Sequence, residues 1–511
     1  MCSKIVLFTI FSVLSISDSA RILGIFQTPT TSTQSVFQAI WKELSLKGHQ
    51  VTVVSPFPLR DKSLVNLTEI DVSGTTKIFL NHDFQFFMNK ERSTTSKIEA
   101  LFNVNYELSE AIFEDDGFKK IYQNPNERFD LIIIQIHINP IFHTLGARFN
   151  APVIGVSSMG GYIGSHFAIG NPNHPALYSE MFLPYHGKLT FSERWYSSFY
   201  NMWVRGYLYF KAMPRCNQIA RKYLGSNIPD IEDLQKDLSI LFLTTNPILY
   251  EPRPNVPIIQ AISQVHLKPV QPLNQELQSI LDNAKNGVIY FSLGSNVQSI
   301  YMPERFRRIL IETFAELPYT ILWKWESEDL PNKPKNVIIK KWLPQQDILA
   351  HPNIKVFMTQ CGLQSLEESF NAGVPIIGVP FIADQEMNIK RLERYGVGLE
   401  INYLSVTKEE LKGKILEVAN NDKYRKKVVE LNSLLNDEPI KGLEKVVWWT
   451  EYVLRHNGTK HLRGPTVDIG WVEFLLLDVI SVTLIFTVLC LLILKRLICF
   501  IFTKKEKLKT K

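Results

Sequence analysis

The densest group of polar residues and glycines that could do chemistry lies between residues 342 and 385. It reads WLPQQDILAHPNIKVFMTQCGLQSLEESFNAGVPIIGVPFIADQ. The run VFMTQ predicts a strand, Gly362 ends it, and LQSLEESFNAG predicts a helix that closes at Gly373. A helix that begins at the end of a strand offers free backbone N–H groups to an anion, and Ser365 in its first turn adds a hydroxyl. The pattern therefore predicts a phosphate site.

Side chains around this helix start supply the other contacts that a nucleotide sugar needs. Trp342, at the end of a predicted strand, offers a flat face to a base. Glu368, further along the helix, is placed to bind ribose hydroxyls, and Asp384 with Gln385 follows a later strand and is placed to bind another polyol. Ring, phosphate and hydroxyl contacts in one segment indicate a nucleotide-sugar site.

Other chemistries have no motif in this chain. It contains neither H-E-x-x-H nor C-x-x-C, and His137 and His143 do not share a helical face, so no metal site is predicted. A G-x-G-x-x-G loop, a Walker loop and a G-x-S-x-G elbow are also absent from the sequence. Nicotinamide redox chemistry, ATP hydrolysis and hydrolysis by a serine nucleophile therefore have no support.

The segment resembles the signature of the UDP-glycosyltransferases, the membrane-bound family 1 glycosyltransferases of animals. Its TQCGLQSLEE version is most similar to the arthropod branch, and the resemblance extends to the FSLGS loop, WLPQ, the following HP, the DQ pair and both ends of the chain. The resemblance implies an α/β fold of GT-B type, with two Rossmann-like domains facing a cleft. The second domain would bind UDP-sugar as co-substrate, predicted to be UDP-glucose, and no cofactor is expected.

The resemblance also implies a donor site built from matching positions in the second domain. These positions are Trp342 on uracil, Gln345 beside it, Ser295, Gly362 and Ser365 at the phosphates, Glu368 at the ribose, and Asp384 with Gln385 at the sugar. Gln360 stands where many relatives have a His, and its amide can still donate to a phosphate oxygen.

The first domain departs from the family pattern where the family keeps its catalytic base. In the family, a His after the first strand takes the proton of the acceptor hydroxyl during an inverting displacement, and an Asp after a later strand orients that His. The matching positions here hold Thr33 and Gln135, neither of which is a base at neutral pH. We interpret Thr33 as a helix N-cap. His137 lies on the same face as Gln135 if the strand continues, so it is a candidate substitute.

Strand and helix signals alternate through two units, which predicts two parallel, doubly wound sheets. The first unit opens with RILGIF, a helix around Val36–Leu44 and the strand QVTVVS, and the second opens with GVIYFSLGS. Prolines between them indicate a linker. The predicted domains are 21–255 for acceptor binding, 256–284 for the linker, 285–445 for UDP-sugar binding and 446–473 for a return segment before the membrane.

An aromatic run over 191–210, FSERWYSSFYNMWVRGYLYF, has two interpretations. As a helix it is either a packed core element or a face that rests on a membrane surface.

Both ends of the chain predict entry into the secretory pathway. Residues 1–20 combine Lys4, an apolar run and small residues, which is typical of a signal peptide. Residues 474–494 are apolar except for Asp478 and are long enough, at 1.5 Å per residue, to cross the roughly 30 Å of a bilayer core. The basic tail, 495–511, follows directly, which predicts a single-pass type I protein with its bulk in the lumen.

The tail also accounts for the net charge. It holds seven Lys and Arg and one Glu, which equals the +6 of the whole chain, so the lumenal part is neutral and no nucleic-acid partner is predicted. The final KLKTK places Lys507 and Lys509 as in signals that return membrane proteins to the endoplasmic reticulum. The reticulum membrane is the predicted location.

Cysteine and sequon usage fits a lumenal glycoprotein without a disulfide framework. Only Cys216 and Cys361 belong to the predicted lumenal part. Asn66 and Asn457 stand in NLT and NGT sequons and are candidate glycosylation sites.

The predicted function is transfer of a hexosyl group, expected to be glucose, from UDP-sugar to small lipophilic acceptors in detoxification. The alternative is a non-catalytic member of the same fold that binds lipophiles or pairs with active relatives. The complete donor signature favours the enzyme, whereas Thr33 and Gln135 favour the alternative. The sequence leaves the acceptor, the choice between glucose and glucuronate, and homo- or hetero-oligomer formation open.

Overall fold

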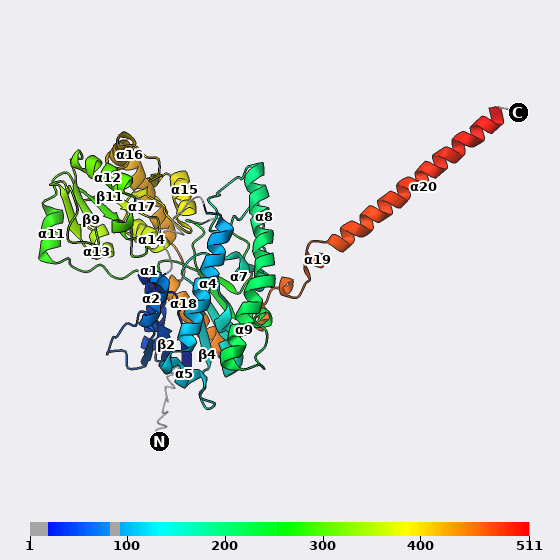
Figure 1. Cartoon of the computed structure of the whole chain (residues 1–511), viewed down its shortest axis with the longest axis horizontal. Coiled ribbons are helices and arrows are strands. Elements are labelled where there is room, and N and C mark those ends of the chain that lie inside the picture. The colour runs from blue at the N-terminus through cyan, green and yellow to red at the C-terminus, as the bar shows by residue number, and fades with distance from the viewer. Residues whose placement is uncertain (1–18, 82–91, 251, 510–511) are drawn as a thin grey trace, which may run out of the picture.

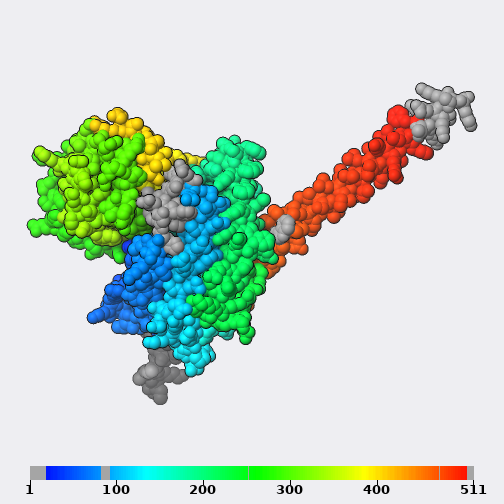
Figure 2. Space-filling view, in the orientation of Figure 1, coloured from blue at the N-terminus to red at the C-terminus, as the bar shows by residue number. Residues whose placement is uncertain are grey.

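The computed structural model describes residues 19–81, 92–250 and 252–509. Most of the predicted signal peptide, residues 1–18, and the last two residues of the tail lie outside the described residues. Two α/β domains lie side by side, and one long helix projects away from them (Figures 1 and 2). Each domain is built on a parallel sheet, as the alternation of strand and helix signals predicts.

The first sheet has the order β3-β2-β1-β4-β5-β6-β7, and every neighbouring pair is parallel. Its strands are β1 (Arg21–Ile25), β2 (Gln50–Ser55), β3 (Leu67–Asp71), β4 (Leu131–Gln135), β5 (Val153–Ser157), β6 (Ile240–Thr244) and β7 (Ile259–Ile262). The central strands β4, β5 and β6 are buried along their whole length, because helices cover both faces of a parallel sheet. Continuous apolar runs such as LIIIQ are the sequence signal of that burial.

Helices from distant parts of the chain cover the two faces of this sheet. The helices of the first domain are α1 (Thr31–Leu46), α2 (Thr76–Asn81), α4 (Thr94–Phe113), α5 (Asp116–Tyr122), α6 (Thr144–Phe149), α7 (Ile163–Ala168), α8 (Phe191–Tyr207), α9 (Met213–Leu224), α10 (Ile231–Lys236) and α18 (Gly442–His456). On one face, Phe37 and Trp41 of α1 share a core with Val446 of α18, so the chain returns to the first domain after completing the second. On the other face, Phe102 of α4 and Val204 of α8 belong to the larger core.

The second sheet is also parallel throughout, with the order β10-β9-β8-β11-β12-β13. Its strands are β8 (Val288–Ser292), β9 (Thr320–Lys324), β10 (Val337–Lys340), β11 (Ile354–Thr359), β12 (Ile376–Gly378) and β13 (Gly398–Glu400). Its helices are α11 (Gln275–Asp282), α12 (Glu304–Ala315), α13 (Gln345–Leu349), α14 (Leu363–Asn371), α15 (Gln385–Tyr395), α16 (Lys408–Asn420) and α17 (Asp422–Asn436).

The connection between the domains is shorter than the predicted linker, 256–284. β7 falls inside that range and pairs with β6 as the edge strand of the first sheet, and α11 packs Leu277 and Leu281 into a core of the second domain. The prolines misled the prediction because proline is compatible with the start of an edge strand, and Pro257 comes just before β7. The connection from the first domain to the second therefore comprises only Ser263 to Asn274.

The aromatic run over 191–210 is packed into the core on one side and exposed on the other. Tyr200 and Val204 are buried in the first domain, whereas Phe191, Trp195 and Met202 are exposed on the outer face of α8. After Tyr207 the helix continues as a π-helical turn, Leu208–Ala212, into α9.

The projecting helix is α20 (Leu477–Lys509), which follows the short α19 (Trp471–Phe474). Its segment Leu477–Phe502 has a mean hydropathy of 2.7 and buries no residue against the rest of the protein, so it is a candidate membrane span by length and composition. The prediction placed the span at 474–494. In the structure the helix starts later and runs through Lys495 and Arg496, because basic residues do not end a helix.

Candidate functional site

A polar cavity lies where α1 of the first domain faces the carboxyl ends of strands in the second. This donor cavity has a volume of about 320 Å³. The first domain contributes the first turn of α1, the connection contributes Lys268, and the second domain contributes Ser295, Trp342 and Ser365. Ligands of open parallel sheets bind at this edge, so the predicted donor residues meet where the topology expects a ligand.

The start of α14 supplies the cavity with backbone donors. β11 ends at Thr359, and Gly362 is the N-cap of α14 with an extended backbone and no side-chain cap. The first N–H groups of the helix therefore keep free hydrogen-bonding capacity at the positive end of its dipole. Cys361 in the preceding turn has φ of 67°, a left-handed conformation that is costly for a non-glycine residue and concentrates at functional sites.

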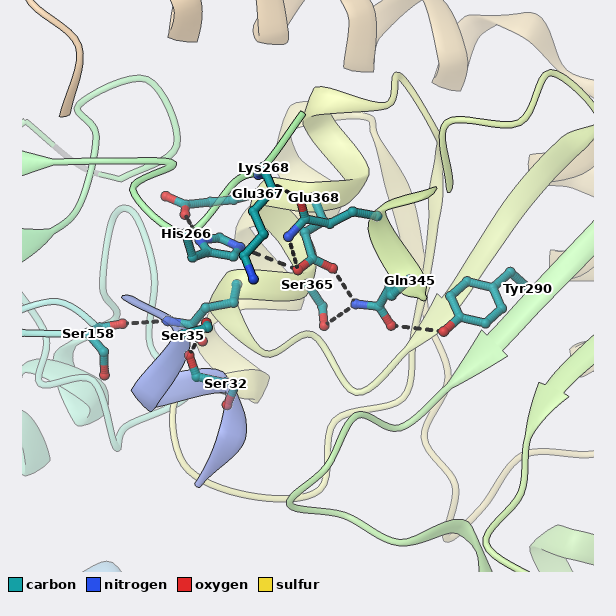
Figure 3. Close-up of polar contacts among 12 residues, drawn as sticks. Ser32, Ser35, Ser158, His266, Lys268, Tyr290, Gln345, Ser365, Glu367 and Glu368 are labelled. Atoms are coloured by element: carbon teal, nitrogen blue, oxygen red, sulfur yellow. Dashed lines mark hydrogen bonds and ion pairs between the residues drawn. The ribbon is translucent and has the colours of Figure 1, made fainter. Parts of the chain in front are cut away.

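Four side chains inside the donor cavity form one hydrogen-bonded network (Figure 3). Gln345 Nε2 donates to Glu368 Oε2 at 2.6 Å and to Ser365 Oγ at 2.9 Å, and Tyr290 donates its hydroxyl to Gln345 Oε1 at 3.1 Å. These bonds fix the orientation of the Gln345 amide and hold one oxygen of Glu368. Trp342 at the rim of the cavity is 65% exposed, which leaves a face of its ring free for stacking.

Gln360 and Gln385 lie behind the cavity wall and join two loops of the second domain. Gln385 Nε2 donates to Gln360 Oε1, while Gln385 Oε1 accepts the backbone N–H groups of Phe381 and Ile382. Gln360 itself approaches the glycine of the FSLGS loop, where a Cβ on Gly294 would lie 2.7 Å from Gln360 Nε2. The FSLGS, TQCG and DQ segments are thereby held together.

The chain matches a family model described as UDP-glucoronosyl and UDP-glucosyl transferase over residues 25–511. It belongs to this family. The sequence is 33% identical to UDP-glucosyltransferase 2 of Dactylopius coccus, over 99% of each chain. It is 32% identical to an ecdysteroid UDP-glucosyltransferase of Spodoptera littoralis nuclear polyhedrosis virus, over 94% of this chain and 97% of the relative.

A mouse protein and a solved structure extend the comparison. Mouse UDP-glucuronosyltransferase 1A7 is 30% identical over 87% of this chain and 85% of its own. The crystal structure of CalG4, the calicheamicin glycosyltransferase, superimposes with a TM-score of 0.55 at 17% identity and covers 86% of this chain and 99% of that one. The structural likeness confirms the predicted GT-B fold with two Rossmann-like domains.

The structure of this glycosyltransferase gives the two substituted catalytic positions other partners. Gln135 Oε1 accepts the backbone N–H of Thr28, and Gln135 Nε2 donates to Thr28 Oγ1. Thr33 is buried as the third residue of α1, and among the described residues that line the donor cavity α1 is represented by Thr31, Ser32 and Ser35 rather than Thr33. The prediction that Thr33 is the N-cap is wrong, because α1 starts earlier and Thr30 takes that position.

His137 does not lie on the strand face that the sequence analysis considered. β4 ends at Gln135, so His137 stands in the loop after the strand. Burial lowers the pKa of His137 to about 4. Its imidazole is therefore neutral and weakly basic at pH 7.

Asp384 faces a second cavity instead of the donor cavity. This polar cavity, of about 240 Å³, lies between the domains and is lined by Asp384 and Arg391 of the second domain and by His166 and Glu180 of the first. Burial raises the pKa of Asp384, whose Oδ2 accepts a bond from Asn388. The predicted donor set is thus divided between two cavities.

A third cavity, of about 320 Å³, is mainly apolar. Its lining combines Ile98, Leu101 and Val104 of α4 with Phe182 of the first domain and Phe381 of the second, next to the DQ pair. We refer to it as the apolar cavity.

Sequence reasoning missed several residues at the donor cavity. Ser32 and Ser35 of α1 and Lys268 of the connection line it, and His266 lies against Glu367 and Glu368 behind it. The two serines could have been predicted from the sequence, since they lie at the start of the helix that follows the first strand. His266 and Lys268 fall in the predicted linker and carry no periodic signal.

The described residues contain no group of three or more His, Cys, Asp or Glu placed to hold a metal ion. In the same part of the chain, Cys216 and Cys361 are both buried free thiols. Asn457, in the second sequon, is exposed at the end of α18, whereas Asn66 is half-buried before β3. Glycosylation at both sites stays a prediction.

Proposed function

We propose that this family member transfers glucose from UDP-glucose to small lipophilic acceptors with inversion at the anomeric carbon. The observation that carries the proposal is its similarity, over nearly the whole chain, to relatives named UDP-glucosyltransferases. In one displacement, the acceptor nucleophile forms a bond to the anomeric carbon while the bond to the β-phosphate oxygen breaks and UDP leaves. The acceptor proton passes to water or buffer.

The donor cavity supports the nucleotide half of this proposal. Trp342 would stack on uracil, the start of α14 with Ser365 would receive the phosphates, and Glu368 would accept the ribose hydroxyls. Ser295 of the FSLGS loop would add a phosphate contact. Asp384, which lines the polar cavity between the domains and not the donor cavity, would contact the sugar together with Gln385. Glu368 already accepts a hydrogen bond from Gln345, which pre-orients its carboxylate.

The apolar cavity supports a lipophilic acceptor. Its aliphatic and aromatic lining favours a molecule that gains from leaving water, and its position beside Phe381 brings such a molecule close to the DQ pair. A role in detoxification follows from this chemistry, because glucosylation makes an apolar compound soluble.

The acceptor class follows from the catalytic positions. With Thr33 and Gln135 in place of the family's base and its partner, neither of these two positions can take the proton of an alcohol. An amine attacks through its lone pair and a carboxylate arrives ionised, so both react without that base. We therefore propose nitrogen or carboxylate acceptors. The same substitutions are the specific observation for the second candidate function, a binding protein without turnover.

The location proposed is the endoplasmic reticulum membrane. The candidate span α20 with its basic end supports a lumenal body and a cytosolic tail. The exposed aromatic residues of α8 fit a body that lies close to the lipid surface.

One experiment tests the function. Microsomes containing the full chain are incubated with radiolabelled UDP-glucose or UDP-glucuronate and with separate phenols, amines and carboxylic acids, and microsomes with the Trp342→Ala variant serve as control. Glucosylation of an amine or acid that Trp342→Ala reduces would support the enzyme. Binding of UDP without any labelled product would favour the non-catalytic alternative.

A further inference from the structure

A buried histidine connects the interdomain segment to the donor site. His266 follows β7 in the connection, and its side chain is 1% exposed. Its Nδ1 lies 3.4 Å from Glu367 Oε2, and its Nε2 lies 3.4 Å from Glu368 Oε1, so the ring stands between the carboxylates of two successive α14 residues (Figure 3).

The charges of this cluster favour a protonated ring. Burial opposes protonation, but the carboxylates of Glu368 and Glu367 hold the pKa of His266 above its ordinary value. Burial raises the pKa of Glu367, and the neighbouring His266 works against that rise. A cation between the buried Glu367 and the partly buried Glu368 reduces the repulsion that the two carboxylates would otherwise exert on each other.

Each carboxylate oxygen of Glu368 has its own partners. Gln345 Nε2 donates to its Oε2, and Gln346 Nε2 donates to Oε1 at 3.2 Å, next to His266. The connection is fixed to the same place, because Lys268 donates its backbone N–H to Gln346 Oε1 at 3.0 Å. His266 and Gln346 therefore both contact Glu368 Oε1.

We propose that His266 is a positioning residue for the donor site, and that its ring holds Glu368 in the orientation that receives the ribose hydroxyls of UDP. The inference rests on the proposed role of Glu368. It assigns the connection a direct part in nucleotide recognition, beyond joining the two domains.

The choice of variants follows from the burial of the cluster. His266→Gln removes the ring and its charge but keeps an amide donor. Because this change leaves Glu367 buried without a cation, the double variant His266→Gln with Glu367→Gln keeps the charge balance and guards against misfolding. His49→Gln is the matched control, since His49 is also 1% exposed and lies 3.9 Å from a carboxylate, that of Glu451, in the first domain.

The readout separates orientation of Glu368 from general damage. Dissociation constants of UDP and of 2′,3′-dideoxy-UDP are measured by calorimetry on the detergent-solubilised full chain. The Kd of dideoxy-UDP divided by the Kd of UDP is the ratio that reports recognition of the ribose hydroxyls. We expect His266→Gln and the double variant to lower this ratio by about 3- to 10-fold through weaker UDP binding, with dideoxy-UDP affinity little changed. His49→Gln should retain the original ratio.

A parallel Glu368→Gln variant distinguishes failure of this inference from failure of the proposed site. If Glu368→Gln lowers the ratio while both His266 variants retain it, Glu368 binds ribose without help from His266 and the inference is overturned. If Glu368→Gln also retains the ratio, the ribose role of Glu368 is wrong and the inference falls with it. An equal fall in His49→Gln would show a nonspecific effect and would likewise overturn the inference.

Discussion

Gln385 and Gln360 are joined by a 3.0 Å hydrogen bond in which Gln385 Nε2 donates to Gln360 Oε1. The side-chain oxygen of Gln385, Oε1, accepts hydrogen bonds from the backbone N–H groups of Phe381 and Ile382 at 2.8 and 2.9 Å. The orientation of this amide is therefore fixed on both ends. Through it, the loop that leads into α15 is tied to the turn that leads into α14.

Gln385→Glu should weaken binding of UDP-glucose by about tenfold and binding of UDP by less. The carboxylate has the same length but cannot donate to Gln360, so two oxygens would face each other in a buried site. Calorimetric titration with both ligands checks this, with Gln218→Glu on the exposed face of α9 as control. Equal weakening of both ligands would place the effect of Gln385 at the nucleotide and contradict a sugar contact.

Trp342→Ala should weaken UDP binding by about 1 to 3 kcal/mol, the range of base stacking on an aromatic ring. The ring is 65% exposed at the rim of the donor cavity, so its removal should leave folding intact. Trp448→Ala provides the matched control, because Trp448 is also exposed, on α18 of the first domain. Unchanged UDP affinity in Trp342→Ala would remove this residue from the site.

Thr33→His combined with Gln135→Glu should raise turnover of phenols by about 10², the lower end of what a positioned base supplies, with amine turnover much less affected. Glutamate is chosen because a carboxylate of this length can still accept from the Thr28 backbone N–H, as Gln135 does. Product formation is compared for one phenol and one amine in both proteins. Rapid phenol glucosylation by the unaltered protein that His137→Ala does not change would require another base and would contradict the proposed acceptor preference.

Glu180 should make the first domain less stable as pH rises. Burial raises the pKa of Glu180 from 4.5 to about 7, against the opposing backbone N–H bonds from Met181 and Ile163. Between these values the folded protein holds a proton that the unfolded chain releases, so the free energy of unfolding falls with pH and levels off above about pH 7.

Glu180→Gln should remove this dependence, because an amide does not titrate. Relative to the variant, the unaltered protein should lose about 3 kcal/mol of unfolding free energy between pH 4.5 and pH 8. Urea unfolding of both proteins, followed by tryptophan fluorescence at several pH values, measures the difference. Parallel pH curves would show that Glu180 titrates normally.

Protease added to sealed microsomes should remove only the part of the basic tail beyond Phe502, a loss of about 1 kDa at ~110 Da per residue. The apolar segment Leu477–Phe502 would shield the chain within the bilayer, and the body would be protected in the lumen. Gel mobility before and after digestion measures the loss, with detergent-opened microsomes as control. Digestion of the body in sealed microsomes would contradict the proposed orientation.

Local patterns in the sequence determined much of this protein. The apolar runs of β2, β4 and β11 predict buried parallel strands, and the observed bounds follow those runs. The TQCG turn with the amphipathic run after it predicts α14 and its phosphate-binding start, because strand ends, glycines and helix periodicity act within a few residues. Most of the family signature lies in one continuous segment, residues 342–385, so most of the predicted donor residues could be identified from it.

Only the tertiary structure decided which distant residues meet. β7 belongs to the first sheet through pairing with β6, although the prolines before it and its short length indicate a linker. Gln135 bonds Thr28, Asp384 faces a different cavity from Glu368, and His266 enters the space between Glu367 and Glu368. These contacts depend on how two sheets and their helices pack. Sequence periodicity reports only local structure, so it does not predict which residues far apart in the sequence come into contact.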